Sequence, residues 1–227
     1  SEELPTGKKL PAGDWALEAP EDYIDVLVAT VTDALKKSGV AKEDIIGIGM
    51  DFTSCTILPI DKDMRPLCSA EEFKDEPHAY VKLWKHHGAQ PQADRITELL
   101  EKRGEINKPQ YGGKISSELM LPKILQIVEE APEVYQAADQ ILEAGDWLTL
   151  CMTGSKRRSA DLAGYKAMWN SETGYPPKDL LEELNPMLKN LVAEKLSEDI
   201  ALAGEAVGNL NKEWAEKLNL PEGIPVA

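Results

Sequence analysis

The chain has 227 residues, enough for one large or two small domains, and its 40 acidic against 25 basic residues give a net charge of −15. Such an acidic balance repels nucleic acids and anionic membranes, so neither is expected as a partner. No apolar run approaches the roughly 20 residues of a bilayer span, and the cysteines lack disulfide or zinc-site spacing, so we expect a cytoplasmic protein with reduced thiols.

The first 61 residues predict an extended lead-in, then a helix and a pair of strands. Residues 1–17 are rich in Pro, Gly and Lys and show no periodicity, with Trp15 as the candidate anchor. From Pro20 apolar residues recur at helical spacing as far as Gly39, a typical helix terminator. Residues 18–61 are therefore interpreted as a helix followed by two strands.

The two predicted strands lie within residues 46–61, one on each side of a polar turn. Gly47 and Gly49 are two residues apart, which leaves one face of the first strand open to a close approach by backbone or ligand. Thr53 and Ser54 come at the carboxyl end of that strand, the edge where open α/β sheets bind small molecules. The turn is thus a candidate floor of a ligand cleft, and the alternative on these residues alone is an ordinary hairpin.

Residues 62–222 are predicted to be mainly helical. Helix capping is assigned to Ser116 or Ser117 for the helix at 120–128 and to Asp146 for the helix that Gly154 ends. A short strand is expected within 139–144, and the segment 159–169 has no clear period. The predicted helices lie at 78–87, 94–103, 120–128, 131–135, 146–153 and 211–218, with two more after Pro176 and Pro186.

The last residues, 223–227, are predicted to begin a strand. Because the lead-in offers no first strand and the final one breaks off, we interpret residues 1–227 as one incomplete domain of a longer protein.

Few residues suggest chemistry by themselves. The sequence has no nucleophile elbow, phosphate-binding glycine loop or zinc-protease motif. His86 and His87 are adjacent and would project differently from a helix, so exposed helical positions are favoured over metal ligands. Trp84 is either a core residue or a stacking surface for a sugar. Lys166 lies in a small-residue segment where its three donors could hold polar ligands, although a surface lysine is the simpler interpretation.

Five motifs in order carry a resemblance: GIGMDFTSCT at 47–56, HAYVKLWKHH at 78–87, GKISSE at 113–118, EAGDW at 143–147 and AGYKAMW at 163–169. Together they resemble the FGGY family of carbohydrate kinases, and within it the members that phosphorylate ribulose. The likeness spans nearly the whole chain. One departure is Leu119, where these kinases usually have tryptophan.

The resemblance implies an α/β fold, a partial actin-like, ribonuclease-H-like ATPase domain with a large helical insertion. It implies transfer of the γ-phosphoryl group from Mg-ATP to the 5-hydroxyl of ribulose, in L-arabinose catabolism. Ser54 resembles the residue that touches the sugar, and Lys166 the lysine that hydrogen-bonds its hydroxyls. Thr53 and Trp84 are weaker candidates in the same cleft.

The resemblance also implies what these residues do not supply. The general base would follow shortly after Ala227, and the nucleotide would bind a second domain, so no catalytic, cofactor or metal residue is assigned within the chain. The chain alone is therefore expected to be inactive and to bind ATP and Mg²⁺ poorly. A homodimer of the parent protein is compatible with the resemblance.

Two alternatives remain at this point. One is another FGGY kinase acting on xylulose or a polyol. The other is a sugar-binding module without catalysis.

Overall fold

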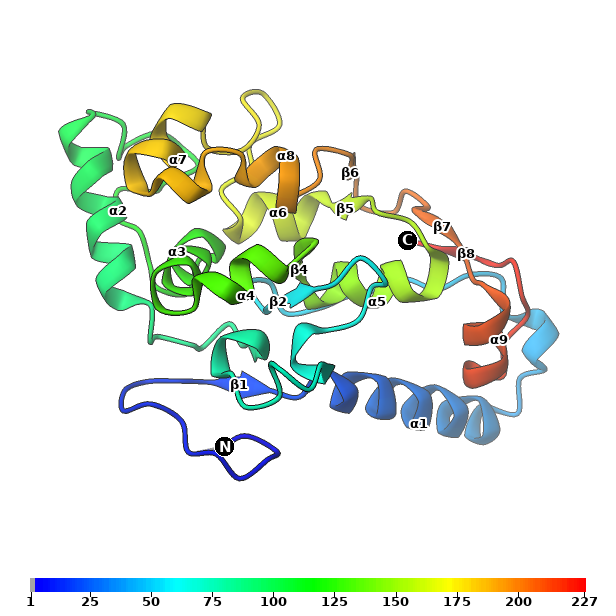
Figure 1. Ribbon diagram of the computed structural model, residues 1–227. Coiled ribbons are helices and arrows are strands. Elements are labelled where there is room, and N and C mark those ends of the chain that lie inside the picture. The colour runs from blue at the N-terminus through cyan, green and yellow to red at the C-terminus, as the bar shows by residue number, and fades with distance from the viewer. Residues whose placement is uncertain (1–2) are drawn as a thin grey trace.

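A computed structural model describes residues 3–227 and has a small antiparallel sheet at its centre (Figure 1). The strand order is β1-β3-β2-β4, from β1 (Leu17–Glu18), β3 (Val81–Lys82), β2 (Ile57–Ile60) and β4 (Gln140–Glu143). Ile57 pairs with Glu143 and Ile60 with Gln140, so β2 and β4 align over their full length. The sheet thus joins segments from three distant parts of the chain.

Both faces of the sheet are buried, which explains the apolar character of β2. Successive side chains of a strand point to opposite faces. Ile57 and Ile141 belong to one hydrophobic cluster, whereas Leu58, Ile60 and Leu142 belong to a second. The sheet is therefore the boundary between two cores.

The first core contains most of the helices (Figure 1). Ile96, Ile124 and Leu180 are fully or almost fully buried in it. Its helices are α2 (Gln90–Lys102), α3 (Met120–Glu130), α4 (Pro132–Ala137), α6 (Ala160–Lys166), α7 (Lys178–Leu184) and α8 (Leu191–Lys195).

The second core lies under α1 (Pro20–Ser38), α5 (Ala144–Thr153) and α9 (Lys212–Leu218). Trp147 of α5 and Trp214 of α9 are almost fully buried there. Pro20 is the only buried residue of α1, so its apolar stripe is half-covered. No helix within residues 3–227 is both long and apolar enough to span a bilayer.

Two short strand pairs complete the structure. Strand β5 (Arg158–Ser159) runs parallel to β6 (Ile200–Ala201), and β7 (Gly208–Asn209) runs antiparallel to β8 (Pro225–Val226).

The predicted strand at 46–50 is limited to a short extended segment. Ile48 makes a parallel bridge to Val226, and residues 48–50 share three backbone hydrogen bonds with residues 225–227, whereas Ile46 is 84% exposed. The neighbours of β2 are β3 and β4, so residues 46–60 are not a hairpin. A Cβ on Gly47 would lie 3.3 Å from the Pro225 carbonyl, so the close approach at this glycine is made by backbone, whereas Gly49 faces open space.

The helix predicted at 78–87 is also absent. Residues Pro77–Ala79 form one 3₁₀ turn, after which β3 pairs with β1 and β2. Cross-strand bonding there prevails over helix propensity. Conversely, the aperiodic segment 159–169 contains helix α6.

The ends of two helices lie where the residues at those positions predict them. Helix α1 begins at Pro20 and ends before Gly39, and α5 ends before Gly154, both glycines having left-handed backbone. The expected caps differ. Asp146 lies inside the first turn of α5, and α3 begins after Leu119 without a side-chain cap, while Ser116 bonds the Glu118 N–H instead.

Candidate functional site

The turn that carries Thr53 and Ser54 is tightly folded. Cys55 has a left-handed backbone, with φ of 65°, which is uncommon for a residue with a side chain. The Thr53 and Thr56 hydroxyls are 3.1 Å apart, Ser54 is half-buried, and Cys55 is fully buried. Such backbone strain persists where surrounding contacts hold it, often at functional sites.

Lys166, at the end of α6, lies against this turn. The Cys55 thiol donates to the Lys166 carbonyl, with Sγ and O 3.7 Å apart. Burial first, and then the charge of Glu143, raise the pKa of the thiol, which keeps the proton for this bond. The side chain of Lys166 is 20% exposed, and its Nζ donates to Glu118 Oε2 at 2.9 Å. The backbone contact thus brings Ser54 and Lys166 into one region.

Lys123 of α3 fixes a second segment beside the same turn. Its fully buried Nζ donates to the Cys55 carbonyl at 2.6 Å and to the Leu83 carbonyl at 2.8 Å. Burial lowers the pKa of Lys123 to about 8. Since Leu83 precedes Trp84, one ammonium group holds together the backbone next to two candidate residues.

Trp84 is 43% exposed and is therefore not a core residue. The two histidines after it lie in a turn, not on the predicted helix, and they differ in environment. His86 is fully buried, its Nδ1 accepting from the Ala16 N–H and its Nε2 donating to Gln126. His87 is half-exposed and contacts Glu118, with Nε2 and Oε1 3.3 Å apart.

The structure therefore brings all four candidates, Thr53, Ser54, Trp84 and Lys166, to segments that contact Lys123 or Cys55. Sequence reasoning missed Glu118 and His87 as members of this region, and Lys123 was not among its candidates. The GKISSE and WKHH motifs contain both missed residues, but their sequences do not reveal the pairing.

Glu143 is a buried carboxylate near this framework. It is 1% exposed, and neither carboxylate oxygen has a hydrogen-bond partner. Burial and the charge of Asp146 raise its pKa to about 8, while Lys123 and Arg158 oppose the shift. Lys123 and Glu143 are thus two buried ionisable groups behind the Cys55 turn, one basic and one acidic.

A separate cavity of about 100 Å³ lies where two extended segments end side by side. Met50 and Ala227 border it, and the Met50 N–H donates to the Ala227 carbonyl at 2.8 Å. Phe52, Asp146 and Arg157 also line it, but none of the four sugar-site candidates does. The Phe52 segment packs closely on α5, because a Cβ on Gly145 would lie 2.9 Å from the Phe52 Cβ.

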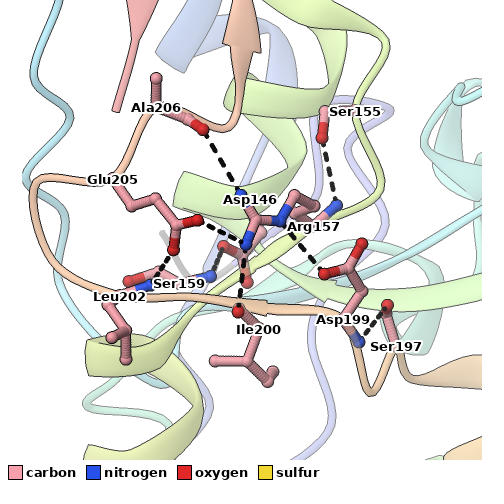
Figure 2. Close-up of polar contacts among 10 residues, drawn as sticks. All are labelled: Asp146, Ser155, Arg157, Ser159, Ser197, Asp199, Ile200, Leu202, Glu205 and Ala206. Carbon is pink, nitrogen blue, oxygen red and sulfur yellow. Dashed lines mark hydrogen bonds and ion pairs between the residues drawn. The ribbon is translucent and has the colours of Figure 1, made fainter.

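Figure 2 shows the polar contacts of Asp146, Arg157 and Ser159, three of the residues that line this cavity. The Arg157 guanidinium bonds Asp199 and Glu205, each at 3.1 Å, and also the carbonyls of Ile200 and Ala206. The Asp146 carboxylate accepts from the Ser159 N–H at 2.9 Å. The Arg157 contacts join the start of β5 to β6 and to the loop that follows β6. Arg157 and Asp146 are therefore already bonded to neighbouring residues of the cavity wall.

Comparison with known proteins decides the family. The model of the FGGY family of carbohydrate kinases, N-terminal domain, matches residues 1–227. The chain belongs to this family.

Relatives in the family are similar over nearly the whole chain. The ribulokinase of Bacillus licheniformis is 52% identical over 225 residues, which are 99% of this chain and 41% of that protein. The ribulokinase of Halalkalibacterium halodurans is 50% identical over 214 residues, 94% of this chain and 38% of that protein. The chain thus spans about two fifths of the length of these relatives.

Solved structures confirm the expected fold class. A gluconate kinase from Lactobacillus acidophilus matches 96% of this chain and 40% of its own with a TM-score of 0.71 at 17% identity. A ligand-bound xylulose kinase from the same species matches 96% of this chain and 40% of its own with a TM-score of 0.69 at 16% identity. The chain therefore has the α/β, actin-like fold of a sugar-kinase domain.

Proposed function

We propose that this chain is the sugar-binding part of an ATP-dependent ribulokinase, which phosphorylates the 5-hydroxyl of ribulose in L-arabinose catabolism. The observation that carries the proposal is the 52% identity to a ribulokinase across 99% of the chain. The xylulose and gluconate kinase structures share the fold at only 16% and 17% identity. Because function depends on the side chains of a site and not on its fold, the sequence likeness favours ribulose.

The candidate site supplies groups suited to a polyhydroxylated ligand. The Lys166 ammonium has three donors, of which Glu118 accepts one. Ser54 contributes a hydroxyl that both donates and accepts, and Thr53 contributes a second. The exposed ring of Trp84 offers an apolar surface for the C–H face of a sugar. In this proposal, Ser54 and Lys166 orient the ketopentose, while Thr53 and Trp84 line the cleft.

The site for ATP and Mg²⁺ is placed in this proposal outside the described residues. Within residues 3–227, no group of three or more His, Cys, Asp or Glu side chains could hold a metal ion. Arg157 and Arg158 bond neighbouring carbonyls and carboxylates. When bound, Mg-ATP supplies the phosphoryl group and neutralises its charge during transfer. We assign it, together with the general base expected beyond Ala227, to the remainder of the whole protein.

A cytoplasmic location belongs to the same proposal, supported by three cysteines that are all free thiols. Homodimerisation of the whole protein stays a prediction, and sedimentation would test it.

The proposal is tested by measuring ADP release from the whole protein with a panel of sugars. We expect the highest kcat/KM with ribulose and much lower values with xylulose, glycerol and gluconate. Lys166→Met should raise the KM for ribulose about tenfold or more, because a charged hydrogen-bond donor is lost, without changing the KM for ATP. Lys156→Met is the matched control, since that lysine is 62% exposed and paired only with Asp139.

Two results would contradict the proposal. A clear preference for xylulose or a polyol would assign the protein to another FGGY activity. ADP formation from ribulose by residues 1–227 alone would refute the division of the chemistry between this chain and the remainder.

A further inference from the structure

Four side chains of alternating charge form a continuous line that ends at the candidate sugar site. Asp14 Oδ2 lies 2.9 Å from His87 Nδ1, and His87 Nε2 lies 3.3 Å from Glu118 Oε1. The second oxygen of Glu118 accepts from Lys166 Nζ at 2.9 Å. His87 and Glu118, the two middle members of the line, therefore each bond through both of their polar side-chain atoms.

The protonation states follow from these contacts. A carboxylate accepts but does not donate, so both ring nitrogens of His87 must carry protons to satisfy their partners. The hydrogen bonds to Asp14 and Glu118 raise the pKa of His87 accordingly. Those from Lys166 and His87 lower the pKa of Glu118. Burial lowers the pKa of Lys166, but the Glu118 contact together with the charges of Cys55 and Tyr165 outweighs burial, so the net shift is upward. The line is thus anion, cation, anion, cation.

The four groups come from four separate segments. Asp14 belongs to the lead-in, His87 to the turn after β3, Glu118 to the loop before α3, and Lys166 to the end of α6. The Lys166 backbone is already held by the Cys55 thiol. Its long side chain would otherwise sample many rotamers, and the Glu118 carboxylate is the hydrogen-bond partner that sets the position of its tip, while the centroid of the Tyr165 ring lies 5.7 Å from the ammonium.

We propose that Glu118 is a positioning residue of the sugar site: it aims the Lys166 ammonium at the sugar hydroxyls, while the His87 imidazolium keeps Glu118 in place. This inference rests on the proposed function for the identity of the ligand. Glu118 accepts a hydrogen bond from one of the three ammonium N–H groups, which leaves two N–H groups to bond the substrate. Without Glu118, the lysine keeps its charge but its ammonium is no longer held in the direction of the sugar.

The first test measures Lys166 directly and does not need a sugar. The rate of acetylation of each lysine at pH 8 is followed by peptide mass spectrometry. In Glu118→Gln, the carboxylate that stabilises the ammonium is gone, so Lys166 should react about two- to fivefold faster, the effect of a partly exposed ion pair. An unchanged Lys166 rate would overturn the proposal.

Glu182→Gln is the matched control for this measurement. Glu182 also pairs with a lysine, Lys189, at 2.6 Å and with both side chains about half exposed. It should leave the Lys166 rate unchanged. A Lys166 acceleration of the same size in both variants would overturn the proposal by showing a general effect of lost charge.

The second test uses kinetics of the whole protein with ribulose. We expect Glu118→Gln to raise the KM for ribulose about five- to tenfold, with kcat within about twofold and the KM for ATP unchanged. Such a split indicates lost sugar binding and not a damaged fold. Glu118→Ala should raise the KM for ribulose more than Glu118→Gln does, because the amide oxygen of Gln still accepts from Lys166. His87→Gln should give a KM for ribulose between that of the unsubstituted protein and that of Glu118→Ala.

An unchanged ribulose KM in Glu118→Ala, or an equal rise in the KM for ATP, would overturn the positioning role. If the unsubstituted protein phosphorylates no sugar, the proposed function fails, and the acetylation rates still decide whether Glu118 holds Lys166.

Discussion

At the residue scale, the most consequential group is the buried ammonium of Lys123. A buried charge costs free energy unless it is paired and hydrogen-bonded. Lys123 meets this condition through hydrogen bonds to two backbone carbonyls, those of Cys55 and Leu83. The same contacts hold the Ser54 turn next to the Trp84 segment, so stability and site geometry depend on one side chain.

Replacing this lysine should therefore lower the stability of the fold strongly. Lys123→Met leaves two carbonyls unbonded and removes one of the two positive charges, with Arg158, that act on the buried Glu143, and we expect the free energy of unfolding in urea to fall by about 3–5 kcal/mol. Adding Glu143→Leu should restore at least about 1 kcal/mol, because the isolated carboxyl group is removed. Lys189→Met, at an exposed pair, should change stability by less than about 0.5 kcal/mol. No recovery in the double variant would contradict the pairing of Lys123 with Glu143.

At the element scale, the start of α9 is held by a side chain that also joins a neighbouring element, that of Asn211. Its Oδ1 accepts from the Trp214 N–H at 3.0 Å and caps α9, while its Nδ2 donates to the Cys151 carbonyl of α5 at 2.8 Å. One amide thus starts a helix and fixes it against the second core.

Asn211→Ala should lower the free energy of unfolding by about 1–2 kcal/mol through loss of the cap and of the bond to α5. Asn211→Ser keeps a capping oxygen and should lose about half as much. Asn209→Ala, two residues earlier at an exposed position, is the control and should be nearly neutral. Equal losses for Ala and Ser at position 211 would show that capping contributes little.

At the scale of the whole molecule, a buried polar cluster attaches the lead-in to β3 and to the residues on either side of that strand. The ammonium of Lys82 lies 4.3 Å from the ring centroid of Trp15, and that ring also contacts the rings of His78 and His86. Lys82 Nζ is buried without a hydrogen-bond partner. Burial lowers the pKa of Lys82 to about 7, of His78 to about 2 and of His86 to about 3.

These shifts make stability depend on pH. Between about pH 7 and 10.5 the unfolded chain holds the Lys82 proton and the folded protein does not, so Lys82 makes stability rise with pH in this window. The histidines act in the same direction between their lowered pKa values and 6.5. We expect Lys82→Met to be more stable than the unsubstituted chain at pH 6, on the order of 3 kcal/mol, with the difference shrinking toward pH 10.

Urea unfolding at a series of pH values checks this expectation. Lys85→Met, which removes an exposed lysine of the same segment, should keep the profile of the unsubstituted chain. A difference between Lys82→Met and the unsubstituted chain that does not vary with pH would contradict the buried-lysine explanation.

Secondary structure was predictable where its cause is local. Pro20 and Gly39 delimit α1, and Gly154 ends α5, because backbone preferences at helix ends depend on the residue itself and its near neighbours. Residues 78–87 have a sequence compatible with a helix, yet β3 forms there because β1 and β2 provide its hydrogen bonds. Such partners lie outside any local window of sequence.

For the candidate site, the sequence by itself determined the family, the turn at Ser54 and the choice of Lys166 as a candidate, because these depend on residue types in a fixed order. Only the tertiary structure decided that Lys123 joins the Cys55 and Leu83 carbonyls and that Glu118 meets both His87 and Lys166. Cys55 and Lys166 are 111 positions apart. Contacts at such a separation depend on how helices and strands pack around the whole core, and no local pattern of side chains specifies that arrangement.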